Sequence, residues 1–96
     1  MPIGPKNSPE SNQALVPSAA VDVTLTSDFD LTTQFAAGYA RELYVGTAGT
    51  VVATMIDDSA SHTYKNLANG STLAGKFVTV KSTGNGTTAS DIVARF

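Results

Sequence analysis

The 96-residue chain has no cysteine, no tryptophan and a single histidine, and charged residues make up only 15% of it. Without cysteine it can form neither disulfide bonds nor thiolate metal sites. Its net charge of −2 does not provide the basic face that nucleic-acid binding needs. No apolar run approaches the roughly 18 residues of a membrane-spanning helix, and no signal-peptide pattern opens the chain. We therefore expect neither nucleic acid nor a membrane among its partners.

The sequence also has little that could perform catalysis. Its one histidine, His62, lies in an alternating segment, and no G-x-S-x-G motif supplies a nucleophile for it to activate. Two acidic pairs, Asp28 with Asp30 and residues 57–58, could form a cation site or a carboxylate dyad. However, Asp also caps turns, and neither pair has the spacing of a calcium-binding loop. Residues 84–86, Gly-Asn-Gly, lack the third glycine, the lysine and the following helix of a phosphate loop. We predict no catalytic residues, no metal site and no cofactor.

What the chain does have is a strand-and-turn composition. Thr, Val and Gly are frequent, apolar residues reach 42%, and short alternating segments are separated by turn residues. Residues 31–39 are ambiguous, since they fit either a short strand or a helical turn that ends at Gly38. The pattern predicts one all-β domain over residues 20–96, a small antiparallel β-sandwich or a flattened, jelly-roll-like barrel. The expected strands cover residues 20–26, the two arms of residues 40–57, and residues 61–67, 73–82 and 89–96.

Residues 40–57 are predicted to form a hairpin at the centre of the sheet. Its turn, at residues 46–49, has a glycine at each end, as a tight hairpin requires. Its second arm is apolar on both faces, so something must cover each side of it. A second turn signal, Asn-Gly within residues 68–71, supplies the positive φ angles of another hairpin.

Residues 1–19 hold all four prolines, which cannot donate hydrogen bonds to a sheet. We therefore expect an extended N-terminal arm. One interpretation is a disordered terminus. The alternative is an arm that orders against a neighbouring subunit, because Ile3, Leu15 and Val16 are apolar anchors that a linker would not need. These three residues are the candidate subunit contacts.

The seven aromatic residues have two possible uses. They could form a platform on which sugars or bases stack, although a domain of this size without tryptophan needs most of them to fill its core. Tyr44 and Tyr64 are the best candidates for exposure, because their hydroxyl groups need a partner or water. Tyr64 and Asn66, on one expected strand, are the candidate ligand-facing residues.

The same features favour an assembly subunit. The surface has few charges, and a domain of this size has a marginal core. Open sheet edges are best stabilised by neighbouring chains. We therefore expect the protein to function in contact with other proteins.

Three segments resemble a family of small virion proteins. They are residues 40–49 (ARELYVGTAG), 63–73 (TYKNLANGSTL) and 86–94 (GTTASDIVA). In order and spacing they follow the family's patterns A-R-x-[LI]-Y-V-G-x-x-G, [TF]-[FY]-x-N-[VL]-x-x-G-[ST]-x-L and G-T-T-A-[ST]-[DN]-I-V-A. The family occurs in tailed phages, prophages and gene transfer agents, and it includes head spike-base and capsid-decoration proteins. The match covers residues 22–96 and departs from the family pattern at residues 74–75 and 94–96.

The resemblance implies a structural virion protein without enzymatic activity. Such a protein would decorate or cement the capsid exterior, or form the base of a head spike or fibre. The implied partners are the major capsid protein, further copies of the chain as a trimer or pentamer, and a head fibre protein. The N-terminal arm, with Ile3, Leu15 and Val16, would then reach the capsid shell or an adjacent subunit. The alternative is a receptor- or glycan-binding module on the virion surface, since phage surface β-domains also bind sugars.

Overall fold

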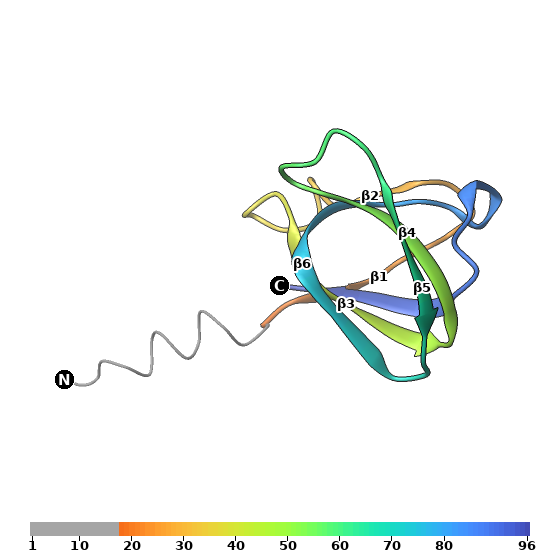
Figure 1. Ribbon diagram of the computed structural model, residues 1–96. Helices are drawn as coiled ribbons and strands as arrows, with labels where there is room; N and C mark the ends of the chain where they lie inside the picture. Colours follow the sequence, from red (N-terminus) through yellow and green to blue (C-terminus); the bar gives the residue numbers. More distant parts are fainter. Residues whose placement is uncertain (1–17) are drawn as a thin grey trace.

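The computed structural model describes residues 18–96, which form an all-β domain (Figure 1). Seven strands make a single antiparallel sheet that is not closed into a barrel, so the all-β antiparallel prediction is confirmed. No helix within residues 18–96 is long and apolar enough to cross a membrane. The strands are β1 (Ala20–Asp22), β2 (Phe29–Asp30), β3 (Ala40–Thr47), β4 (Gly49–Met55), β5 (His62–Leu67), β6 (Ser71–Val80) and β7 (Ser90–Arg95), and a short 3-10 helix, η2 (Thr83–Asn85), precedes β7.

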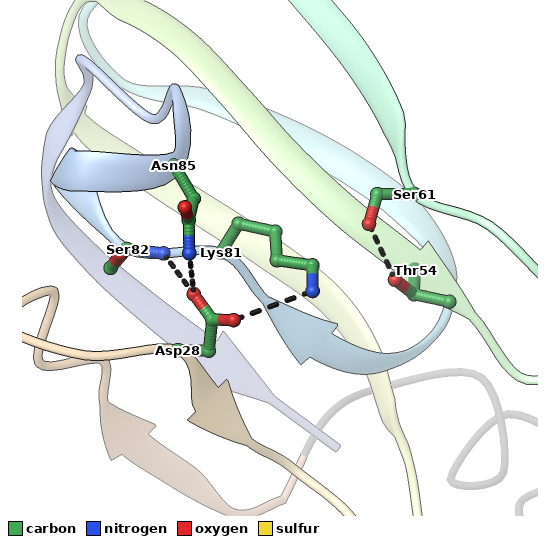
Figure 2. Close-up of polar contacts among 6 residues, drawn as sticks. All are labelled: Asp28, Thr54, Ser61, Lys81, Ser82 and Asn85. Atoms are coloured by element: carbon green, nitrogen blue, oxygen red, sulfur yellow. Dashed lines mark hydrogen bonds and ion pairs between the residues drawn. The ribbon is translucent and has the colours of Figure 1, made fainter.

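The centre of the fold is one long, bent hairpin. Its first arm is β3 followed by β4, and its second arm is β5 followed by β6. The ladder runs in almost constant register, from Ala40 opposite Phe77 at one end to Ala53 opposite His62 at the other. Residues 56–61 form its loop, and the hydroxyl groups of Thr54 and Ser61 are hydrogen-bonded at 3.1 Å at the base of that loop (Figure 2).

The predicted hairpin turn at residues 46–49 is wrong. Strands β3 and β4 do not pair with each other, and β6 lies between them in the strand order. The two glycines are needed for a different reason. A Cβ on Gly46 would lie 2.7 Å from the backbone oxygen of Asp91, and a Cβ on Gly49 would lie 2.6 Å from the backbone nitrogen of Ala89. The glycine pair therefore marks a bend where β7 and the segment before it approach the arm closely, not a reversal of the chain.

The second predicted hairpin, at residues 68–71, is also wrong in its pairing although its turn is present. Gly70 has the expected positive φ of 77°, but β5 and β6 are not neighbours in the sheet. Residues 68–70 form instead the bend of the second arm, which lies against the bend of the first. The backbone N–H of Gly70 donates to the carbonyl of Val45 at 2.7 Å, and Asn69 Oδ1 accepts from the N–H of Ala48 at 2.6 Å.

These bends fold the sheet over a single core. Past the bends, the end of β6 also pairs with β4, along the edge of β4 that β5 leaves open. Strand β7 pairs with the edge of β3 opposite β6, and β1 pairs with β7. The resulting order is β1-β7-β3-β6-β4-β5, with β2 beside the end of β6. The inward-facing side chains are almost completely buried, the largest being Phe77, Leu31, Leu43, Ile92, Val45, Val51 and Val80.

Two local predictions differ in extent from the structure. Strand β1 is shorter than the expected residues 20–26, yet Val23 is buried and the alternation of apolar and polar positions continues to residue 26. Residues 31–39 form turns that end at Gly38, whose φ is 83° and whose N–H donates to the carbonyl of Phe35. The helical-turn alternative was therefore closer to the structure than a strand.

Candidate binding site

Asp28, one member of the first acidic pair, holds a loop. Its Oδ1 accepts hydrogen bonds from the side-chain amide of Asn85 at 2.9 Å and from the N–H of Ser82 at 2.8 Å. Its Oδ2 lies 3.3 Å from Nζ of Lys81 (Figure 2). The Asn85 bond, followed by the Ser82 bond, lowers the pKa of Asp28 to about 2, because these donors favour the ionised carboxylate. Asp28 thus fastens the chain before β2 to the loop that contains η2.

The other acidic residues of the two pairs lie at or beside turns, with Asp30 at the end of β2 and residues 57–58 in the loop of the long hairpin. Asp30 Oδ1 accepts from the hydroxyl and the N–H of Thr32, at 2.6 and 2.9 Å, and these bonds lower the pKa of Asp30. Asp58 Oδ2 lies 3.5 Å from Nε2 of His62, in the loop of the long hairpin. Within residues 18–96 no group of three or more His, Asp or Glu side chains is placed to hold a metal ion. The turn-capping interpretation of Asp30 is confirmed by its two bonds to Thr32.

The fold accounts for the positions of both predicted ligand-facing residues. Tyr64 is partly buried and packs edge-on against Phe77, with ring centroids 6.1 Å apart. Burial, and then the nearby charge of Asp58, raises the pKa of the Tyr64 hydroxyl. Asn66 is exposed with a left-handed φ of 63°, where the register between β4 and β5 shifts, and Asn tolerates this conformation better than most residues. A ligand contact by either residue stays a prediction.

A bulge between β3 and β6 shapes a surface hollow that the sequence did not reveal. Between two paired positions, β3 has one residue, Arg41, where β6 has two, Gly75 and Lys76. Bulges redirect side chains and are frequent beside functional sites. These three residues and Tyr39 line a hollow of about 390 Å³.

Aromatic rings hold both cations of this hollow. The guanidinium carbon of Arg41 is 4.5 Å from the ring centroid of Phe96, and Nζ of Lys76 is 5.6 Å from that of Tyr39. The rings of Tyr39 and Phe96 meet edge to face at 5.5 Å, and Phe35 stacks on Phe96 at 5.9 Å. Cation–π attraction and ring packing thus fix the side chains around the opening. Tyr39, Arg41 and Lys76 line the hollow, Phe96 packs against the first two, and Phe35 stacks on Phe96. We call these five residues together the aromatic hollow.

The two cations of the aromatic hollow have no acidic partner within residues 18–96. Two other cations of the domain do, since Arg95 and Lys81 contact carboxylates at 2.6 and 3.3 Å. No such ion pair joins Arg41 or Lys76 to a described residue. A guanidinium and an ammonium group without partners attract an anionic group.

Sequence reasoning missed this site because its residues are far apart in the chain. Arg41, Lys76 and Phe96 belong to three different strands or strand ends. One local signal was present, since Tyr39 and Arg41 are two residues apart, the spacing of side chains on one face of a strand.

The three predicted N-terminal contact residues lie outside the described residues: Ile3, Leu15 and Val16. The described chain begins next to the aromatic hollow, because the N–H groups of Ser18 and Ala19 both donate to the carbonyl of Phe96. Comparisons with models of protein families, with curated proteins and with solved structures found no match to this chain.

Proposed function

We propose that this protein is a structural virion protein of a tailed phage, which works through contacts with other proteins and not through catalysis. It decorates or cements the capsid exterior, or forms the base of a head spike or fibre, as a homo-oligomer with the major capsid protein as its partner. The observation that carries the proposal is the aromatic hollow, where Arg41, Tyr39 and Phe96 gather at the surface. Aromatic residues and arginine are the types most enriched at protein interfaces.

The unpaired edges of the sheet also support contacts with other chains. Strands β1 and β5 stand at the two ends of the strand order, and each has one partner strand within residues 18–96. An edge strand presents backbone donors and acceptors to which another chain can add.

The assignment to a phage capsid comes from the three segments that resemble the virion family. These segments contact one another in the structure: Asn69 of the second bonds to Ala48 of the first, and Gly49 of the first lies against Ala89 of the third. The three segments therefore include residues that fix the bends. This supports a shared architecture with the family more directly than a shared binding site.

The test is the location of the native protein in particles. Phage or gene-transfer particles from the organism that encodes this protein would be purified by density-gradient centrifugation and probed for the protein. The major capsid protein serves as the positive marker and an abundant cytoplasmic protein as the negative one. The proposal expects this protein to band with the capsid protein in a fixed ratio. Its presence only in the soluble part of the lysate would contradict the proposal.

A receptor- or glycan-binding module on the virion surface is the second candidate. The specific observation in its favour is also the aromatic hollow, because sugars stack on aromatic rings and acidic sugars pair with cations. It predicts that a glycan array binds the wild-type protein and not a Tyr39→Ala variant, whereas the structural proposal predicts no selective glycan binding by either.

A further inference from the structure

An acidic hairpin tip lies beside the aromatic hollow. The loop of residues 56–61 begins at Ile56, whose N–H donates to the carbonyl of Lys76 at 2.8 Å. At 44% exposure, Ile56 is the only large apolar side chain exposed in residues 18–96. Asp57 and Asp58 follow it and are also exposed. In Figure 1 this loop lies at the top of the molecule and the C terminus at its left, with the turns of residues 31–39 between them in the view.

The tip and the hollow are complementary, yet they do not pair within one chain. The tip presents one apolar side chain and two carboxylates, and the hollow presents the ring of Tyr39, with that of Phe96 packed beside it, and two cations. No ion pair joins Asp57 or Asp58 to Arg41 or Lys76, and the contact of Asp58 is with His62 at 3.5 Å. Both sets of charges are therefore available to a neighbouring molecule.

We infer that the aromatic hollow receives the hairpin tip of a second copy of this chain. Ile56 of one copy packs against the rings of Tyr39 and Phe96 of the other, while the two aspartates of the tip meet Arg41 and Lys76. Aromatic anchors surrounded by paired charges are the usual composition of a protein interface. The inference rests on the proposed function only for the expectation that copies assemble, and it names the surface through which they do so.

Self-association of the purified full-length protein is the first measurement. Light scattering over a concentration series at low ionic strength should give a mass above that of the monomer. The mass should fall towards the monomer in about 1 M salt, where the Debye length shrinks to about 3 Å and exposed charges no longer attract each other. The mass reached at high concentration also gives the number of copies. A dimer indicates that two copies pair reciprocally, and a larger closed number indicates head-to-tail pairing around a ring.

Charge reversal separates this surface from any other contact. A double variant with Arg41→Glu and Lys76→Glu, and another with Asp57→Lys and Asp58→Lys, should each be monomeric, because tip and hollow then carry the same sign. A quadruple variant with all four changes should assemble again, since its tip is basic and its hollow acidic. It should not assemble with the wild-type protein, whose tip would meet a hollow of the same sign.

Lys65→Glu is the matched control. Lys65 is an exposed cation on β5, outside the hollow, so its reversal should leave the mass unchanged. Circular dichroism and thermal melting check that each variant is folded. A wild-type monomer at every concentration, or assembly that persists in both double variants, would overturn the inference. So would a folded quadruple variant that stays monomeric. Because these measurements use the protein alone, their failure leaves the particle test of the proposed function untouched.

Discussion

The side-chain carbonyl of Asn69 accepts a hydrogen bond from the N–H of Ala48 at 2.6 Å, and this bond joins the two bends of the long hairpin. The N–H of the next residue, Gly70, donates to the carbonyl of Val45 at 2.7 Å. Two neighbouring bonds thus connect the arms at the point where both change direction. They fix the angle at which the two halves of the sheet enclose the core.

Asn69→Ala should destabilise the domain by about 1 kcal/mol, the usual net contribution of one hydrogen bond at a site that water can reach. Asn69→Asp keeps an acceptor in the same place and should lose much less. Urea denaturation of the three proteins gives the comparison. Equal stability of the alanine variant and the wild type would show that the bond does not hold the bend.

Gly46→Ala should cost about 1–3 kcal/mol, because the added Cβ would lie 2.7 Å from the backbone oxygen and the Cβ of Asp91, which a flexible side chain cannot relieve. Gly84→Ala is the matched control, since a Cβ there meets nothing closer than 3.8 Å. Thermal melting should show a lower Tm for Gly46→Ala than for the wild type, and a nearly unchanged Tm for Gly84→Ala. A Gly46→Ala protein as stable as the wild type would mean that β7 can move away without cost.

Thr87→Val should destabilise the domain by about 1–3 kcal/mol. Thr87 is fully buried and its Oγ1 accepts from the N–H of Val52 at 3.1 Å, so the change leaves this partly buried N–H without its side-chain acceptor. Thr88→Val removes a similar bond to the N–H of Thr50, but at an exposed position where water can replace the hydroxyl. In urea denaturation Thr87→Val should therefore have a lower free energy of unfolding than Thr88→Val, and the opposite order would contradict this account.

Asp28 should make the stability depend on acid pH. Because its folded pKa is lowered to about 2, against an unfolded value of about 3.9, its contribution is present above about pH 4. The contribution is lost as the pH falls through about 2. Asp28→Asn cannot ionise, so the variant should be less stable than the wild type at pH 5, and the difference should shrink by pH 2. Urea denaturation at the two pH values tests this, and a difference that does not change with pH would rule it out.

The positions of strands were largely predictable, whereas their pairing was not. Alternation along Val21, Val23 and Leu25 is a local property, and these side chains do face inward to different degrees. The glycines at positions 46 and 49 carry no local sign of why they are needed. The cause is the close approach of Asp91 and Ala89, about 40 residues further along the chain. A turn and a bend look alike in the sequence until that neighbour is known.

The candidate site was predictable only in part for the same reason. The two-residue spacing of Tyr39 and Arg41 was the one local signal of the site, but the sequence did not assign Tyr39 to a strand. Lys76 and Phe96 join them through the bulge in β6 and the packing of the C-terminal ring. In contrast, Tyr64 has the right residue type, but the edge-on packing with Phe77 draws its ring toward the core.

The long hairpin also has a kinetic consequence. Its loop of residues 56–61 is short, so the ladder can form outward from Thr54 and Ser61 with little loop-closure entropy. The pairing of β3 with β7 closes a far longer loop, from Val45 to Ile92. We therefore expect the hairpin to form the folding nucleus and β7 to dock late. Ser61→Ala should then mainly lower the folding rate, seen in the folding arm of a chevron plot. Ile92→Val should mainly raise the unfolding rate, seen in the unfolding arm.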